Sequence, residues 1–104
     1  MEELDESWVD ILSGHASARF RWLDVRSRSD REIEPSPNPA VVHVPLDELT
    51  ARVQAVLSHS AEIIVFGSDD AQAVAAARTL DQLGYANVVV FADGFDALRR
   101  AGLV

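Results

Sequence analysis

The pattern of apolar positions predicts strands that alternate with helices. Four short apolar runs, rich in Val, Ile and Phe, are typical of strands buried on both faces of a parallel sheet. They are residues 20–25, 40–44, 62–66 and 87–91. Helical spacing of apolar residues follows over 46–57, 71–83 and 94–101, and the polar stretch 27–34 is long enough for one or two helical turns. The alternation predicts a three-layer α/β/α domain around a central, mainly parallel sheet of four or five strands.

The start of the chain has a different pattern. Ser7 precedes a short amphipathic run that begins at Trp8, and Gly14 follows it, which predicts a short capped helix. A chain of 104 residues is close to the usual size of one domain. We therefore expect residues 1–19 to form a helical extension packed on a domain at residues 20–104.

The charge balance limits the classes of partner. The formal net charge is −8, with 17 acidic and 9 basic side chains, and all nine basic residues are Arg. Such a chain is a poor candidate for binding nucleic acid or an anionic membrane surface, whereas it favours a basic protein partner or a cation. The acidic N-terminus and the lack of an apolar run of membrane-spanning length predict a cytoplasmic location.

The chain contains no cysteine, which excludes disulfides, thiolate nucleophiles and Cys-ligated metals. The three His residues are scattered without a metal-ligand spacing, so we expect no metal and no cofactor. A hard cation held by Asp69 and Asp70 together with Asp24 or Asp93 is the alternative.

Ligands of open parallel sheets bind at the carboxyl ends of the strands, and the most suggestive loop there follows Phe66. This candidate binding loop consists of Gly67, Ser68, Asp69, Asp70, Ala71 and Gln72. Strand, polar loop and helix N-terminus together make a cradle of N–H groups for an anion. Asp69 and Asp70 offer a simpler interpretation, because their carboxylates can cap the helix from within.

Five motifs, in this order and at this spacing, resemble the rhodanese homology domain of single-domain thiosulfate sulfurtransferases, many of them bacterial, from about Phe20 to the end. They are Leu23-Asp24-Val25-Arg26, His43-Val44-Pro45-Leu46, the strand, loop and Ala-rich helix from Ile63 to Leu83, Leu83-Gly84-Tyr85-Ala86-Asn87-Val88, and Asp93-Gly94-Phe95 with Ala101-Gly102-Leu103. The resemblance implies a rhodanese-like fold and assigns the loop after Phe66 to the active site of the family.

The departures from that family concern its chemistry. Active rhodaneses carry at the loop start a Cys that takes up sulfane sulfur as a persulfide, and the matching position here is Gly67. A basic loop residue of many relatives matches Gln72, and Asp69 and Asp70 make the loop acidic, which disfavours an anion such as thiosulfate. The resemblance therefore implies a catalytically inactive rhodanese-like domain that acts as a binding or regulatory module through residues 67–72.

Two alternatives stay open. The resemblance also allows an enzyme of the sulfurtransferase/phosphatase-like superfamily, in which Ser68, a metal-bound water or an externally supplied thiol serves as the nucleophile, although a hydroxyl needs a base to become reactive. The chain is a structural or interaction subunit if the loop is vestigial. Asp24 and Arg26 are interpreted as a structural network beside the loop rather than as catalytic groups.

Overall fold

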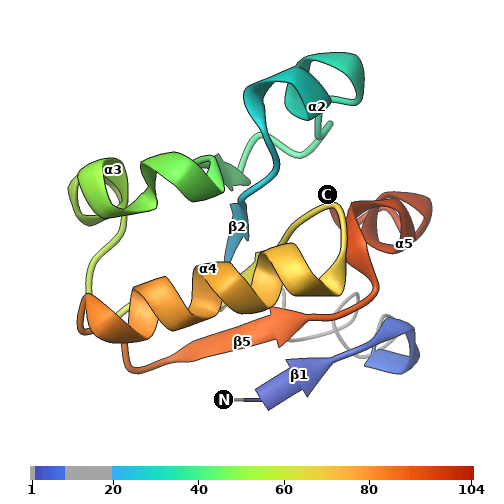
Figure 1. The fold of residues 1–104 in the computed structure, drawn as a ribbon. Coiled ribbons are helices and arrows are strands. Elements are labelled where there is room, and N and C mark those ends of the chain that lie inside the picture. The colour runs from blue at the N-terminus through green and yellow to red at the C-terminus, as the bar shows by residue number, and fades with distance from the viewer. Residues whose placement is uncertain (1, 9–19) are drawn as a thin grey trace.

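The fold is known from a computed structural model, which describes residues 2–8 and 20–104. Strands and helices alternate along the chain as the apolar pattern predicts (Figure 1). The elements in order are β1 (Glu2–Leu4), the 3₁₀ turn η1 (Glu6–Trp8), β2 (Arg21–Asp24), α2 (Arg28–Ile33), β3 (Val42–His43), the 3₁₀ turn η3 (Leu46–Glu48), α3 (Leu49–Val56), β4 (Ile63–Phe66), α4 (Asp70–Gln82), β5 (Val88–Phe91) and α5 (Gly94–Arg100).

The five strands form one sheet in the order β1-β5-β4-β2-β3, and each neighbouring pair is parallel. The central strand β4 is buried over its whole length, which explains its uninterrupted run of apolar residues. Because all strands run the same way, their carboxyl ends meet at one edge, and the loops that follow them lie together there. The expected parallel sheet and the α/β fold are confirmed.

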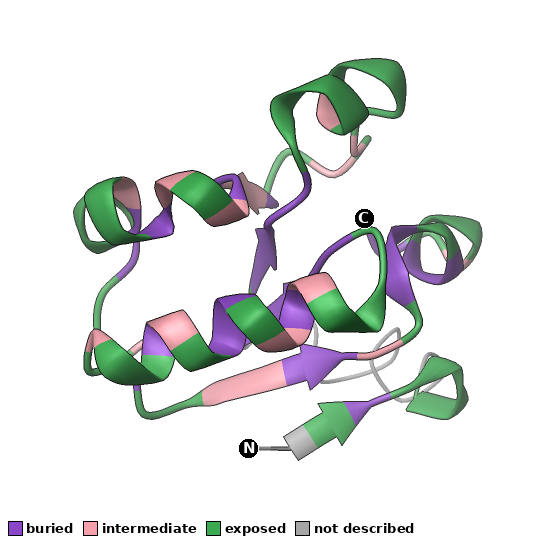
Figure 2. Ribbon diagram, in the orientation of Figure 1, coloured by how far each residue is buried: buried purple, intermediate pink, exposed green. Residues whose placement is uncertain are grey.

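Helices cover both faces of the sheet (Figures 1 and 2). Adjacent residues of a strand face opposite sides, so Leu23 and Val65 belong to one buried cluster and Trp22 and Ile64 to the other. The first cluster includes the inner faces of α3 and α4, with Leu49, Val53, Ala73, Ala76, Ala77 and Leu80. The second includes α5 and the chain end, with Phe95, Ala97, Leu98, Leu103 and Val104. Two cores on the two faces make the domain three layers deep.

The start of the chain differs in part from the sequence expectation. Residues Glu2–Leu4 form the edge strand β1 beside β5, and Leu4 is buried in the second cluster. A strand of three residues with two acidic side chains has no periodicity that a sequence pattern could reveal. The 3₁₀ turn η1 includes Ser7 and Trp8, and the rest of the segment predicted to be a helix lies outside the described residues. The predicted division at residue 20 stays a prediction.

Candidate functional site

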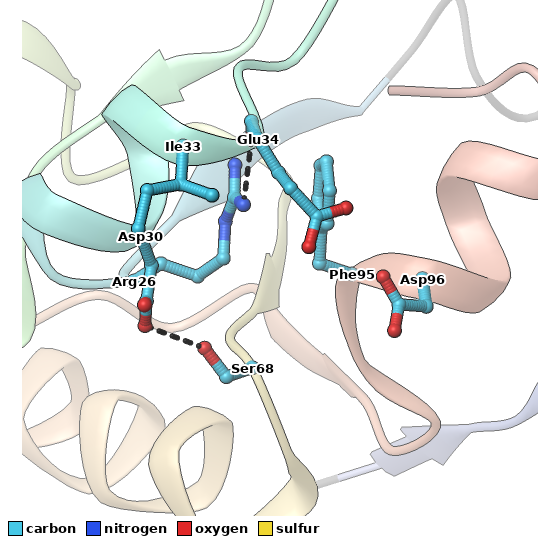
Figure 3. A pocket seen from close by; sticks show the side chains of 7 residues that line it. All are labelled: Arg26, Asp30, Ile33, Glu34, Ser68, Phe95 and Asp96. Atoms are coloured by element: carbon cyan, nitrogen blue, oxygen red, sulfur yellow. Dashed lines mark hydrogen bonds between the residues drawn. The ribbon is translucent and has the colours of Figure 1, made fainter.

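A pocket of about 240 Å³ opens at the carboxyl edge of the sheet. Three segments that follow strands contribute to it: the segment after β2, which contains α2, the loop after β4, and the start of α5 after β5 (Figure 3). It is lined by Arg26, Asp30, Ile33, Glu34, Ser68, Phe95 and Asp96. In Figure 3, Asp30 and Ile33 lie on one side of this pocket and Phe95 and Asp96 on the other.

Arg26 and Asp24 form a buried ion pair beneath the pocket. Arg26 Nη2 lies 2.8 Å from Asp24 Oδ2, and Arg26 Nε donates to the same carboxylate. The backbone N–H of Arg26 also donates to Asp24 Oδ1 at 3.0 Å. Both side chains are almost fully buried, at 3% and 0% exposure. A second cation lies near the same carboxylate, since Arg31 Nε is 3.9 Å from Asp24 Oδ2. The structural role expected for Asp24 and Arg26 stays a prediction, and loss of Arg26 would leave the buried Asp24 with the more distant Arg31 as its cation.

The guanidinium of Arg26 also joins two of the pocket walls. Its Cζ lies 3.5 Å from the centre of the Phe95 ring, a cation–π contact between the β2 segment and α5. Its Nη1 donates to the backbone oxygen of Glu34 at 2.8 Å, at the end of α2. Arg26 therefore contacts the C-terminal cap of α2 and the ring of Phe95 in α5, on two sides of the pocket (Figure 3).

The loop after β4 satisfies its own donors. Asp69 is the N-cap of α4, and its Oδ1 accepts from the backbone N–H of Gln72 at 2.9 Å. The side-chain oxygen of Gln72 turns back and accepts from the backbone N–H of Ser68 at 2.8 Å. The self-capped interpretation of the loop is confirmed for Asp69. The second acceptor, Gln72, was not expected from the sequence, because only a folded loop brings its amide over Ser68.

Gly67 stands at the position of the family nucleophile, and the space beside it is filled. It is buried. A Cβ atom built on Gly67 would lie 2.5 Å from Gln72 Oε1 and 3.0 Å from Gln72 Cβ. Carbon and oxygen atoms cannot approach so closely without a shift. The Gln72 side chain thus occupies the place where a side chain at position 67 would begin.

A second glycine holds the loop against α5. Gly94 has a φ of +78°, and a Cβ there would lie 2.7 Å from the backbone oxygen of Ser68. The next amide, that of Phe95, donates to the backbone oxygen of Gly67 at 2.9 Å. The Asp93-Gly94-Phe95 motif therefore packs its backbone directly on the start of the loop, which no larger residue at position 94 would allow.

Carboxylates predominate around the pocket. Asp30 accepts from Ser68 Oγ at 3.2 Å, and Glu34 lies 3.6 Å from Arg99 Nη1 in a half-exposed ion pair. Asp96 adds a third carboxylate. Among the described residues that line the pocket, Arg26 is the only cation, and its charge is balanced by Asp24. The pocket thus carries an excess of negative charge.

A neighbouring carboxylate also raises the pKa of Glu3 in the edge strand β1. Asp70, at the first turn of α4, raises the pKa of Glu3 above its ordinary value through a hydrogen bond and through like-charge repulsion. A hydrogen bond between two carboxyl groups requires that they share a proton, which is why the pKa rises. Asp69 and Asp70 thus differ in role: Asp69 caps α4, whereas Asp70 contacts β1.

The structure brings some predicted site residues together and adds others. Ser68 and Arg26 line the pocket, whereas Asp69, Asp70 and Ala71 do not. Sequence reasoning missed the lining residues contributed by α2, its C-terminal cap and α5, because short helices with mixed polar and apolar residues carry no signal of a site on their own. These are Asp30, Ile33, Glu34, Phe95 and Asp96. Their position, directly after strands β2 and β5, was the available clue.

Nucleophilic and metal chemistry have little support in the described residues. Ser68 Oγ donates to Asp30. His43 Nε2 lies 2.9 Å from the backbone oxygen of Arg26 and His59 stacks on Tyr85, so neither imidazole of the described residues is paired with Ser68. Within residues 2–8 and 20–104, no three His, Cys, Asp or Glu side chains are grouped to hold a metal ion. In the same ranges, no helix is both long and apolar enough to cross a membrane.

A profile of the rhodanese-like domain family matches residues 7–101, nearly the whole chain. The chain therefore belongs to the rhodanese-like domain family, and it is a member without cysteine. The match extends N-terminal to the boundary expected at residue 20. A search of curated proteins gave no match.

Solved structures with the same fold agree with this assignment. A rhodanese-like domain of an Anabaena protein is 29% identical with a TM-score of 0.70, over 80% of this chain and 93% of that one. The solution structure from the same Anabaena protein has a TM-score of 0.79 at 24% identity, over 98% and 76% of the two chains. The human single-domain sulfurtransferase TSTD1 has a TM-score of 0.73 at 21% identity, over 96% of each chain.

Proposed function

We propose that this protein is a catalytically inactive rhodanese-like domain of the cytoplasm that serves as a binding or regulatory module. Its contact surface is the loop of residues 67–72 with the adjoining pocket between α2 and α5. The chain contains no cysteine, so the persulfide chemistry of active relatives has no nucleophile here. A pocket with a volume of about 240 Å³ adjoins the loop.

One observation carries the proposal. The side chain of Gln72 lies where a nucleophile at position 67 would stand and accepts the hydrogen bond of the Ser68 amide. In an active loop, backbone N–H groups stabilise an anionic sulfur. Here the neutral side-chain oxygen of Gln72 accepts the hydrogen bond that an anionic sulfur would accept in an active loop. The Ser68 N–H therefore has an acceptor without a thiolate or an anionic substrate.

The test is sulfur transfer from thiosulfate to cyanide. We expect the native protein to show the rate of a heat-treated sample. The matched variant is Gly67→Cys with Gln72→Ala, which supplies a thiol and removes the side chain that fills its place. Activity in this variant alone would show that the assay works on this fold and that the missing nucleophile is the cause. Transfer by the native protein clearly above the heated control would overturn the proposal.

A hydrolytic function is the second candidate, and the contact between Ser68 Oγ and Asp30 is what favours it. A hydroxyl that donates to a carboxylate in a pocket has part of the arrangement that activates a serine. Hydrolysis of an activated ester that Ser68→Ala abolishes, while Ser58→Ala leaves it unchanged, would support this function over the binding module. Equal, background rates in all three proteins would reject it.

A further inference from the structure

The pocket has the size of one side chain rather than of a cofactor. Its volume is about 240 Å³, against roughly 300–1,000 Å³ for sites that enclose small-molecule ligands. It is open at the surface, where Asp30, Ile33, Glu34 and Asp96 are all exposed. A group that enters from outside, attached to a larger partner, fits this shape.

The walls of the pocket combine apolar surface with negative charge. Ile33 is 77% exposed, the largest exposure among the large apolar side chains described, and Phe95 lies on the opposite side (Figure 3). An exposed isoleucine at the mouth of a pocket is a contact surface for methylene groups. The carboxylates of Glu34, Asp30 and Asp96 surround this apolar part. Long basic side chains have the matching composition, an aliphatic stem and a charged end.

The protein's own cations already bind to these walls. Arg26 stacks on the ring of Phe95 at 3.5 Å, and Arg99 lies 3.6 Å from Glu34. The Arg99–Glu34 pair is half-exposed, with both side chains about 50% accessible, so it is weak and open to exchange with another cation. Arg26, in contrast, is held by buried Asp24 and does not compete for an incoming group.

From these observations we infer that the pocket binds one cationic aliphatic side chain, a lysine or arginine, presented by a basic partner protein. This inference rests on the proposed function and names the chemistry that its contact surface recognises. The net charge of −8 attracts the same class of partner at long range. An anion is disfavoured at the pocket for the same electrostatic reason.

The test is an amide NMR titration of the whole protein with two tripeptides whose termini are capped and uncharged. They are acetyl-Gly-Lys-Gly-amide and acetyl-Gly-norleucine-Gly-amide. The two probes differ only in the terminal ammonium. We expect the lysine peptide to shift the amides of residues 30–34, 68 and 94–96, and the norleucine peptide to bind there more weakly by roughly two- to fivefold, the factor that one partly exposed ion pair supplies.

Matched variants locate the contacts. Asp96→Asn is expected to lower the affinity for the lysine peptide by roughly two- to fivefold and to leave the affinity for the norleucine peptide unchanged. Ile33→Ser is expected to lower the affinity for both peptides, because it removes the apolar contact. Asp81→Asn is the control: this exposed residue of α4 lies outside the pocket lining, so its variant keeps the native affinity for both probes.

The outcomes are distinct. Equal binding of the two peptides would overturn the cation inference and would leave the pocket as an apolar contact site. No shift with either peptide, together with saturable shifts at residues 67–72 on adding thiosulfate, would overturn it in favour of an anion in the loop. The enzymatic assay tests the proposed lack of sulfur transfer separately. A failure of the proposed function is therefore distinguished from a failure of the cation inference.

Discussion

Gln72 Oε1 accepts a hydrogen bond from the backbone N–H of Ser68 at 2.8 Å and lies 2.5 Å from the position of a Cβ on Gly67. The identity of residue 67 and the conformation of residue 72 are therefore coupled. A side chain at 67 and the inward conformation of Gln72 exclude each other. The absence of a side chain at position 67 thus allows the conformation in which Gln72 binds the Ser68 amide.

This coupling predicts non-additive stabilities. Gly67→Ala should lower the free energy of unfolding by about 1 kcal/mol, because Gln72 must rotate away and lose its hydrogen bond. In a Gln72→Ala background the same change should cost less, since the bond is already absent. Urea unfolding of the two single variants and the double variant measures the difference. Strictly additive effects would show that the two residues do not interact.

The two glycines with similar φ angles should respond differently to alanine. Gly94 and Gly102 have φ values of +78° and +77°. Gly102→Ala should cost about 1–2 kcal/mol from backbone strain alone, since nothing lies within 4 Å of its Cβ position. Gly94→Ala should cost more, because its Cβ would also meet the Ser68 oxygen at 2.7 Å. Thermal unfolding of both variants tests this, and equal losses would contradict the close packing of α5 on the loop.

The buried ion pair should matter more than a surface one. Arg26→Met should destabilise by about 3 kcal/mol, because it leaves the buried Asp24 with the more distant Arg31, 3.9 Å away, as its cation. Arg28→Met, which breaks the surface pair with Glu48, should destabilise the protein much less, because solvent screens that pair. Chemical denaturation compares the two.

A double variant separates charge from packing at this ion pair. Asp24→Asn combined with Arg26→Met removes both charges, and it should recover part of the stability lost in Arg26→Met. Failure to recover any would assign the loss to the contacts of Arg26 with Phe95 and Glu34 instead.

The contact between Asp70 and Glu3 predicts a pH dependence. Because Asp70 raises the pKa of Glu3 in the folded protein, the folded state binds more protons than the unfolded state between the ordinary and the raised pKa of Glu3. The stability from this group is therefore present below the ordinary pKa and is lost as the pH rises through the raised one. Asp70→Asn should return the pKa of Glu3 toward its ordinary value.

Side-chain carboxyl chemical shifts followed by NMR across the acidic range measure that pKa. Asp69→Asn is the matched control, since Asp69 caps α4 and is not among the groups that shift Glu3. An unchanged Glu3 pKa in Asp70→Asn would contradict the contact.

The accuracy of the sequence predictions followed the strength of the local signal. The strand 63–66 and the helix 70–82 were predictable because buried strands need apolar runs and helices need a 3.6-residue period. The cap at Asp69 followed from local chemistry at a helix start. The strand β1 was missed, since its pairing with β5 joins residues more than 80 positions apart and leaves no local pattern.

The sequence by itself determined the alternation of strands and helices, membership in the rhodanese-like family, the absence of a thiol and the acidic charge. These properties depend on composition and on neighbours along the chain, so they can be read before folding. Only the tertiary structure decided that Gln72 fills the place beside Gly67, and that Ile33, Glu34 and Asp96 share one pocket with Phe95. Such contacts depend on distances across the parallel sheet edge, where residues from separate loops meet.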